Sequence, residues 1–314
     1  MKVLVTGGAG FIGSHIVDAY LAAGHDVAVV DDLYTGLRGN LNPKARFHHV
    51  DVRDRRLWDV IEMERPEVVN HQAALGNVRA SMEDPMVYAD VNVVGGLNLL
   101  EAARKFGVRK VIYSSTGGCV YGEPVRIPAD ESHPIAPRDP YGVSKAAFEM
   151  YLPLYSWHHG IRYTTLRYPN VYGPRQDPLG EAGVVSIFIG QMLRGLPTLV
   201  NGDGEQQRDF VYVGDVARAN LMMLKNGDDE AFNLGTGRGV SVNTIYDHLN
   251  HLTGYGRPRV HGPAKPGEVR VSCLDASKIL AAAGWKPETG LEDGLRATVE
   301  FFRPRFEIRK ELRC

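Results

Sequence analysis

The sequence contains only three cysteines, and their spacing gives no sign of a cross-link. Cys119, Cys273 and Cys314 are far apart in the chain, and no C-x-x-C motif is present. This pattern argues against both a disulfide framework and a zinc site. We therefore expect no metal and a reducing compartment. A chain of 314 residues buries about three quarters of its surface on folding, which stabilises a core without cross-links.

The chain also lacks an excess of charge of either sign and a long apolar run. Its 36 lysines and arginines nearly balance 37 aspartates and glutamates, and no apolar run approaches the roughly 18 residues of a membrane span. The chain begins Met1-Lys2-Val3-Leu4-Val5 and runs directly into a glycine turn, unlike a secretory leader. These absences argue against nucleic-acid and membrane partners. We expect a soluble, cytoplasmic protein that holds any anionic ligand by local charge.

What the sequence does contain is an alternation of short β-branched runs with helical-period segments. Strands are predicted at residues 2–6, 26–30, 47–52, 67–73, 110–115 and 162–168. Helices are predicted at 12–23, 55–64, 86–106 and 141–159, and Pro153 predicts a kink or an early end in the last of these. This order predicts parallel βαβ units in one sheet of about six strands. The fold class is therefore α/β, a Rossmann-type doubly wound parallel sheet.

The regular alternation of predicted strands and helices ends after Asn170. Turn-forming residues follow, and then a helix is predicted at 184–194. At about 150 residues per domain, the length fits two domains. We expect a Rossmann domain at residues 1–170 and a smaller C-terminal, substrate-binding α/β domain at 171–314, with some segments interleaving.

A glycine-rich loop joins the first predicted strand to the first predicted helix. It places Gly7, Gly10 and Gly13 where a tight turn, close backbone approach to a pyrophosphate and close helix packing require them. The second strand ends in Asp31-Asp32, whose carboxylates can accept hydrogen bonds from ribose hydroxyls and would repel a 2′-phosphate. The alternative is a glycine turn that merely packs, but the strand, helix and acidic context favour a loop that binds NAD rather than NADP.

Asp51-Val52 ends the third predicted strand. An acidic side chain there can hold the adenine amino group, or it can cap the following helix. The sequence leaves both roles open.

Tyr141 and Lys145 are one helical turn apart at the start of a predicted helix. A free tyrosine has a pKa of about 10 and becomes a base at neutral pH only beside positive charge. Lys145 supplies such a charge, although a chance pair on a solvated helix face is the alternative. The hydroxyls of Ser114, Ser115 and Thr116 cluster at a strand end, where one of them could bridge Tyr141 and a substrate, or where they could simply satisfy turn backbone.

These motifs, together with His71-Gln72-Ala73-Ala74, resemble those of the extended short-chain dehydrogenases/reductases. Within that superfamily the chain looks most like the UDP-galactose (UDP-glucose) 4-epimerases, because residues 167–174, 208–215 and 265–268 also match. The resemblance implies a UDP-hexose substrate, a tightly held NAD and a 4-keto intermediate. Tyr141 would take the 4-OH proton while hydride passes from sugar C4 to the nicotinamide and returns to the opposite face.

The resemblance also implies roles for individual residues. Lys145 would bind the nicotinamide ribose, and the diphosphate of the sugar nucleotide would be held by Asn170, Arg208 and Lys265, the last standing where arginine is usual. Thr116 would supply the catalytic hydroxyl, with Ser115 as the rival. The cofactor would be lined by Phe11, Ile12, Gln72, Ala73, Ala74, Asn92 and Tyr168.

Ser272 aligns with the family position whose size gates the substituent on sugar C2. Because serine is small, we expect N-acetylated substrates, UDP-GlcNAc and UDP-GalNAc, to be accepted as well. Related enzymes also predict a homodimer through the helices at 86–106 and 141–159, although burial within one chain explains their apolar faces equally well.

Two other functions compete with epimerisation. A nucleotide-sugar 4,6-dehydratase or decarboxylase would share the cofactor loop and the Tyr/Lys pair, but it needs a carboxylate at the strand end, and residues 115–120 contain none. A non-enzymatic NAD-binding regulator would share the fold. Such proteins commonly lack the Tyr/Lys pair that this sequence has.

Overall fold

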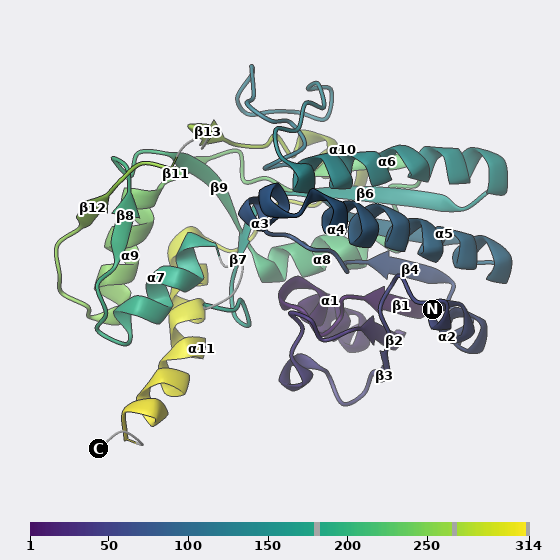
Figure 1. Cartoon of the computed structure of the whole chain (residues 1–314), viewed down its shortest axis with the longest axis horizontal. Helices are drawn as coiled ribbons and strands as arrows, with labels where there is room; N and C mark the ends of the chain where they lie inside the picture. Colours follow the sequence, from purple (N-terminus) through teal and green to yellow (C-terminus); the bar gives the residue numbers. More distant parts are fainter. Residues whose placement is uncertain (179–182, 266–268, 312–314) are drawn as a thin grey trace.

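A parallel sheet forms the centre of the molecule, a computed structural model that describes residues 1–178, 183–265 and 269–311. Seven strands follow the order β10-β6-β5-β4-β1-β2-β3 (Figure 1). Without β10 this is the 3-2-1-4-5-6 order of a doubly wound sheet, which confirms the predicted Rossmann-type fold. The strands are β1 (Lys2–Thr6), β2 (Asp26–Asp31), β3 (Arg46–His49), β4 (Val68–His71), β5 (Lys110–Thr116), β6 (Arg162–Tyr168) and β10 (Glu230–Asn233).

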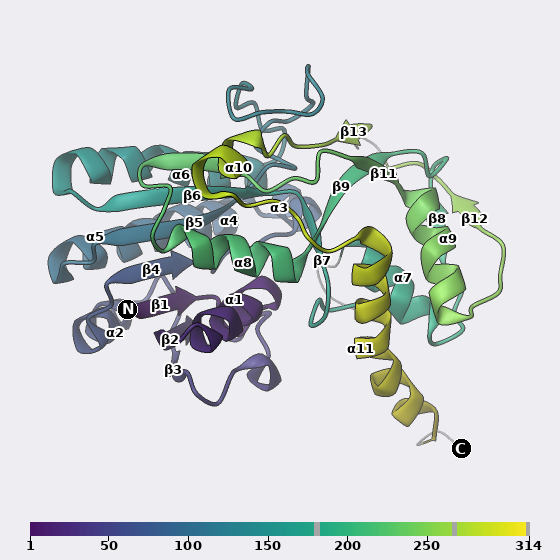
Figure 2. The same ribbon diagram turned by 180° about the vertical axis from the view of Figure 1, so that it is seen from behind.

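Helices cover both faces of this sheet (Figures 1 and 2). Val3 and Val5 of β1 pack toward one face, while Leu4 between them packs toward the other. A strand buried on both faces must be apolar throughout, which explains the continuous apolar run of β1. The first face is covered by α1 (Phe11–Ala22), α8 (Val213–Met223) and α10 (Ser277–Ala283), and the second by α2 (Arg56–Glu64), α5 (Gly95–Phe106) and α6 (Pro140–His159).

The structure departs from the predicted elements in several places. The sheet gains a seventh strand, β10, from the part of the chain after Asn170. The predicted helix at 86–106 is three pieces, because a π-helical turn, η2 (Asp90–Val94), separates α4 (Pro85–Ala89) from α5. Pro153 lies inside α6, and the helix continues past it to His159. Because Pro153 is exposed, the hydrogen bond that the helix loses there is on its solvent side. The strands predicted at 47–52 and 67–73 end earlier, at His49 and His71.

A smaller layered region lies beside the carboxyl ends of the central strands (Figure 1). Its sheet joins β7 (Asn170–Tyr172), β9 (Gln207–Tyr212), β11 (Gly239–Ser241) and β13 (Val271–Ser272), and β8 (Leu199–Asn201) pairs with β12 (Val260–Gly262). Three helices pack around a separate apolar core: α7 (Val184–Met192), α9 (Val242–Thr253) and α11 (Leu291–Glu311). Because α8, β10 and α10 return to the central layers, the division at residue 170 stays a prediction.

The remaining described elements are short: η1 (Arg38–Asn40) after β2, and α3 (Val78–Glu83) before α4. None of the described helices is long and apolar enough to cross a membrane. Among the same residues, no group of three or more His, Cys, Asp or Glu side chains is arranged to hold a metal ion.

Candidate active site

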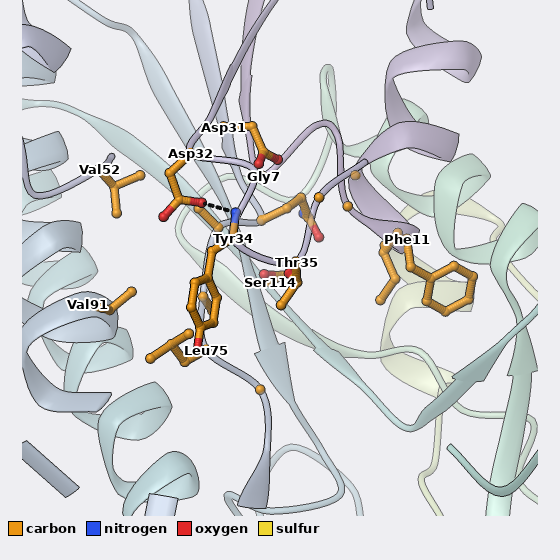
Figure 3. Close-up of a pocket in the computed structure, with 18 of the residues that line it drawn as sticks. Gly7, Phe11, Asp31, Asp32, Tyr34, Thr35, Val52, Leu75, Val91 and Ser114 are labelled. Carbon is orange, nitrogen blue, oxygen red and sulfur yellow. Dashed lines mark hydrogen bonds between the residues drawn. The ribbon is translucent and has the colours of Figure 1, made fainter. Parts of the chain in front are cut away.

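A cavity of about 920 Å³ opens at the carboxyl ends of the central strands. Asp31 and Asp32 lie at one end of it, and Phe11 lies on the side opposite Val52 and Val91 (Figure 3). This is the crevice where the strand order reverses between β1 and β4, the usual ligand site of such sheets. The predicted residues that line it are Gly7, Gly10, Phe11, Ile12, Gly13, Asp31, Asp32, Asp51, Val52, Gln72, Ala73, Ala74, Ser114, Ser115, Tyr141, Lys145 and Tyr168.

The glycine loop brings backbone close to backbone at two of its positions. Gly7 has a φ of +69°, and a Cβ there would lie 2.7 Å from the Ala73 nitrogen. At Gly13 a Cβ would collide with the Gly7 carbonyl oxygen. Gly10 differs, because a Cβ there would meet only one atom within 4 Å, and Gly10 is the N-cap of α1 without a side chain to bond the helix end. The first N–H groups of α1 therefore face the cavity as an anion site.

Asp31 fastens this loop to the end of β2. Its Oδ2 accepts a hydrogen bond of 2.9 Å from the Ala9 N–H, and its Oδ1 accepts one of 2.8 Å from the Leu33 N–H. Burial raises the pKa of the Asp31 carboxyl. Asp32 accepts the Tyr34 N–H at 3.0 Å (Figure 3). Each carboxylate oxygen has a further lone pair, so these acceptors remain able to bind hydroxyl groups in the cavity.

Asp51 is held by Arg53 rather than by a helix end. The Arg53 guanidinium donates to Asp51 Oδ2 at 2.6 Å, and it keeps the pKa of the Asp51 carboxyl below its usual range. The carboxylate that bonds to the first turn of α2 is Asp54, which accepts the Arg56 N–H at 2.8 Å. Asp51 therefore makes no bond to α2, which has no side-chain cap at its N-cap residue Arg55. Asp51 lies in the cavity wall, and its role toward the adenine stays a prediction.

Tyr141 and Lys145 lie on one face of α6, and both line the cavity. Asp139 caps this helix by accepting the Gly142 N–H at 2.7 Å, so Tyr141 sits in its first turn. Lys145 is fully buried, and burial lowers its pKa to about 7, although Glu149 one turn later opposes that shift. Its ammonium lies 4.4 Å from the centroid of the Tyr113 ring. A lysine perturbed in this way beside a tyrosine, in a cavity, is typical of a catalytic site.

The three hydroxyl residues at the end of β5 have different surroundings. Ser114 donates to the His71 carbonyl at 3.1 Å, which satisfies backbone as the alternative interpretation expects. Ser115 lines the cavity, as Ser114 does, but its hydroxyl is buried without a hydrogen-bond partner in the protein. Thr116 is outside the cavity wall, and its side chain hydrogen-bonds to the Cys119 thiol. A Cβ at Gly142 would lie 3.1 Å from the Cys119 Cβ, so Cys119 links Thr116 to the first turn of α6.

Asn92 lies behind the cavity wall rather than in it. Its Oδ1 accepts the Leu75 N–H at 2.9 Å, and its amide nitrogen donates to the Leu75 carbonyl at 3.1 Å and to Ser144 Oγ at 2.9 Å. The π-helical turn that carries Asn92 is thus tied both to the wall segment after β4 and to α6. Gln72 and Tyr168, both in the wall, are joined by a bond of 3.2 Å, and burial raises the pKa of Tyr168 to about 12.

The predicted substrate residues gather on the smaller sheet. Arg208 of β9 and Ser272 of β13 are partners in the strand register, and Asn170 of β7 pairs with Phe210 farther along β9. The positive charge of Arg208 opposes the rise that burial causes in the pKa of Cys119, so it acts on the corner that holds Thr116. Lys265 lies between β12 and β13, outside this register. Residues 266–268 of the predicted diphosphate motif lie outside the described residues.

Several wall residues were missed from the sequence. Some belong to the loop that follows Asp31-Asp32. They could have been predicted from the position of this loop directly after the acidic end of the strand. Another group, Arg175 to Asp177, follows Gly173-Pro174 and was interpreted only as turn-forming sequence. The missed residues are Leu33, Tyr34, Thr35, Gly36, Leu37, Asn40, Val50, Arg53, Leu75, Gly76, Val87, Val91, Arg175, Gln176 and Asp177.

Comparisons with known proteins agree with this geometry. The model of the NAD dependent epimerase/dehydratase family matches residues 3–235. A UDP-glucose 4-epimerase of Mycolicibacterium smegmatis is 42% identical over 310 residues, covering 96% of this chain and 99% of that protein. The crystal structure of a UDP-glucose 4-epimerase from Thermotoga maritima with UDP-glucose has a TM-score of 0.95 at 48% identity, covering 97% and 99% of the two chains. That of the Thermus thermophilus enzyme, complexed with NAD, has a TM-score of 0.92 at 46% identity, covering 96% and 99%.

Structures of proteins named for other activities are similar at lower identity. A UDP-N-acetylglucosamine 4-epimerase from Methanobrevibacter ruminantium has a TM-score of 0.91 at 34% identity, covering 97% and 98% of the chains. A dTDP-glucose 4,6-dehydratase from Streptomyces venezuelae has a TM-score of 0.90 at 31% identity, covering 98% of both. The shared fold therefore spans several reactions, and the site must distinguish among them.

Proposed function

The chain belongs to the NAD dependent epimerase/dehydratase family, and on that basis we propose that it is an isomerase, a 4-epimerase that interconverts UDP-galactose and UDP-glucose. The observation that carries the proposal is the pairing of Tyr141 with the buried Lys145 in the wall of the crevice. Relatives named UDP-glucose 4-epimerase cover nearly the whole chain, so the same reaction is the simplest function for this pair.

The residues of the cavity fit NAD. The open N-terminus of α1 at Gly10 suits a pyrophosphate, and the acidic end at Asp31 and Asp32 suits ribose hydroxyls while repelling a 2′-phosphate. The Ser115 hydroxyl, buried without a partner in the protein, offers one more polar contact to such a ligand. A bound NAD would supply the group that takes a hydride from sugar C4 and returns it.

The chain's own residues would move the proton. The Tyr141 phenolate takes the proton of the sugar 4-OH, and the Lys145 ammonium stabilises that phenolate by its charge. Thr116, near the first turn of α6, is our candidate for the hydroxyl that bridges Tyr141 and the substrate oxygen. After the 4-keto sugar has rotated to present its opposite face, Tyr141 returns the proton to the same oxygen. Because the hydride would return to C4 as well, the reaction has no net redox change.

The smaller sheet would hold the nucleotide sugar. Arg208 can donate two parallel hydrogen bonds to a phosphate, and Asn170 and Lys265 add donors for the same diphosphate. Ser272, the register partner of Arg208, is a small side chain beside this site. We therefore propose that an N-acetyl group at sugar C2 is accommodated, so that UDP-GalNAc and UDP-GlcNAc are substrates too.

The alternative reactions find less support in the site. Dehydration or decarboxylation needs a carboxylate beside the hydroxyl cluster, and residues 115–120 at the end of β5 contain none. A regulator that only binds NAD needs no proton-transferring pair, so the presence of Tyr141 and Lys145 in the wall favours an enzyme.

We also propose a homodimer, because an apolar stripe on α6 is exposed. Val143, Met150, Leu154 and Trp157 follow helical spacing along one face, and Trp157 is 85% exposed. Met86 on α4, a helix in contact with α6, is also 81% exposed. A second copy of the chain would cover this surface through a self-complementary interface. A cytoplasmic location is proposed from the free thiols of Cys119 and Cys273.

A panel of UDP-sugars with and without a C2 acetamido group tests the function. Purified protein should convert UDP-galactose to UDP-glucose, and UDP-GalNAc to UDP-GlcNAc, each detected by anion-exchange chromatography. Turnover of UDP-galactose alone would remove the proposed role of Ser272 and leave the epimerase standing. Release of a 4-keto-6-deoxy sugar would replace epimerisation with dehydration.

A further inference from the structure

The turn after β7 reaches across the crevice to the first helix. Arg175 Nη2 pairs with Asp18 of α1 at 2.7 Å, and His15 of the same helix donates from Nε2 to the Pro174 carbonyl at 2.9 Å. These two contacts hold residues 174–175 against α1, and Arg175 and Gln176 line the cavity together with Gly10 and Phe11. A positive side chain from the later part of the chain thus lies in the same cavity wall as the helix N-terminus where we place the cofactor pyrophosphate.

Two polar atoms of this turn are buried without a hydrogen-bond partner: Nη1 of Arg175 and Oε1 of Gln176. The other end of the Gln176 amide donates to the Val171 carbonyl at 3.2 Å, and its side chain is nine-tenths buried. A buried donor of a charged group that lacks a partner is costly, and native proteins rarely keep one without a ligand or water to satisfy it. Here an unsatisfied donor and an unsatisfied acceptor lie next to each other in the sequence and in one cavity wall.

The backbone of Arg175 supports a functional origin for this arrangement. Arg175 has a φ of +69°, a left-handed conformation that a side chain with a Cβ adopts at a cost. Strain of this kind persists where surrounding contacts determine it, and it is concentrated at ligand sites. The contacts with Asp18 and His15 are of that kind, because they fix the turn against α1.

We propose that Arg175 is a further binding residue for the dinucleotide cofactor, donating from Nη1 to its diphosphate while Asp18 holds Nη2. The proposal rests on the proposed NAD-dependent function. A dinucleotide carries acceptor oxygens on its diphosphate next to donor hydroxyls on its riboses, which complements the donor of Arg175 beside the acceptor of Gln176. Arg175 would thereby close the crevice over the cofactor from the side of the C-terminal half.

A nucleotide sugar carries a diphosphate as well, so two ligands share the relevant chemistry. The geometry favours the dinucleotide, because Arg175 is tied to α1 and shares the wall with Gly10 and Phe11. Arg208, the candidate for the sugar diphosphate, lies on β9 of the other sheet. The experiment must therefore measure the two ligands separately.

The test compares the holoenzyme with three variants, Arg175→Gln, Arg175→Lys and the control Arg296→Gln. Arg296 is an exposed arginine of α11 that pairs with Glu292, so its substitution removes the same charge outside the cavity. The rate of NAD release is measured by dialysing the purified holoenzyme and assaying free NAD by enzymatic cycling. Affinity for the second ligand is measured by calorimetry with UDP, and folding by the thermal midpoint.

Arg175→Gln should release NAD about tenfold faster or more, since a charge-assisted hydrogen bond is lost. Arg175→Lys, which keeps the charge but not the fork, should lie between it and the parent, and Arg296→Gln should match the parent. UDP affinity should stay within about twofold. If Arg175→Gln is unfolded, Arg175→Lys decides instead: NAD release faster than that of the parent supports the assignment, and unchanged release removes it.

Two results would overturn the assignment. Unchanged NAD release in both Arg175 variants would remove it, and weaker UDP binding with unchanged NAD release would transfer Arg175 to the nucleotide sugar. Failure of the proposed function looks different, because the parent protein itself would then carry no NAD or convert no UDP-sugar.

Discussion

The Asn92 amide nitrogen lies 2.9 Å from the Ser144 hydroxyl oxygen, although 52 residues separate the two in the chain. Ser144 precedes Lys145 on α6, and the other contacts of Asn92 go to the Leu75 backbone in the cavity wall. One buried amide therefore connects the helix that carries the proton-transferring pair to the wall that faces the cofactor. Asn92 lies in the π-helical turn at Asp90–Val94, and such turns are frequent at functional sites.

Replacing Asn92 should weaken the attachment of both α6 and the cavity wall at Leu75. Asn92→Leu keeps the volume but leaves the Leu75 N–H and carbonyl without partners, and each buried unsatisfied group costs roughly 1–3 kcal/mol. We expect the free energy of unfolding in urea to fall by at least that amount and NAD release to quicken. Ser144→Ala removes one of the three bonds of Asn92 and the bond of 2.7 Å from the Ser144 hydroxyl to the Tyr141 carbonyl, and it should have a smaller effect because the bonds to Leu75 remain. An Asn92→Leu protein as stable as the parent would contradict this role.

Tyr141→Phe should keep the fold and the bound NAD while lowering the rate of epimerisation by about a hundredfold or more, because general acid–base catalysis is lost. The measurement is the initial rate with UDP-galactose, alongside the NAD content of the purified protein. Tyr151→Phe is the matched control, since Tyr151 lies on the same helix and packs against the apolar core. Near-parental activity of Tyr141→Phe would refute the assignment of the base.

The roles of the Thr116 and Ser115 hydroxyls at the end of β5 should be distinguished by measuring kcat and NAD release. Thr116→Val, which keeps the shape, should lower kcat with NAD content unchanged, because Thr116 lies toward the first turn of α6 through Cys119. Ser115→Ala should mainly quicken NAD release, because its unpartnered hydroxyl lines the cofactor cavity. The opposite pattern would identify Ser115 as the catalytic hydroxyl and exclude Thr116.

Stability should fall in acid because of His71. This histidine is fully buried, its ring nitrogen Nδ1 is 2.7 Å from Thr6 Oγ1, and burial, with the charge of Lys145, lowers its pKa to about 3. Since the folded-state pKa lies below the unfolded value of about 6.5, the folded chain binds fewer protons between these values. Its contribution is complete above pH ~6.5 and is lost as the pH falls toward 3, at up to about 1.4 kcal/mol per pH unit.

His71→Gln should flatten the dependence of unfolding free energy on pH between about 6.5 and 4, measured by urea titration at several pH values. The exposed His251 provides the control, as His251→Gln. Parallel curves for His71→Gln and the parent would show that His71 does not control the acid response.

Charge on the exposed stripe of α6 should break the proposed dimer. Trp157→Glu and Met150→Glu place a carboxylate in the centre of the interface, where its desolvation is unfavourable. Sedimentation velocity should show the mass of two chains for the parent and of one chain for these variants. Leu280→Glu on α10, which covers the opposite face of the sheet, should leave the mass unchanged. A parent that sediments as a single chain would contradict the dimer.

The local signals in the sequence were strong enough to predict the central fold and the loop of Gly7, Gly10 and Gly13. β1 and β6 have the predicted bounds, because a continuous β-branched run between turn residues has few other solutions. β10 was missed because four residues with two buried side chains show no distinctive period. The π-helical turn was missed as well, since the apolar residues continue at helical spacing through it and its contacts through Asn92 are with distant parts of the chain.

In the site, too, residues marked by a local motif were predicted, and residues placed by tertiary contacts were not. Residues that a motif marks, such as Asp31, Tyr141 and Lys145, were found and lie in one cavity. Arg175 was missed because nothing in a turn sequence indicates that its side chain crosses to α1. Asp51 shows the limit of local reasoning, since its carboxylate is held by Arg53 while Asp54 bonds to the helix end.

The most direct test of the central claim is the reaction of UDP-galactose in D2O without added cofactor, followed by proton NMR. We predict that the purified protein forms UDP-glucose, that Tyr141→Phe forms almost none, and that no deuterium enters C4 of the product, because the hydrogen removed from C4 is not exchanged with solvent. Formation of UDP-glucose carrying deuterium at C4, or no UDP-glucose at all from protein that contains NAD, would contradict the account.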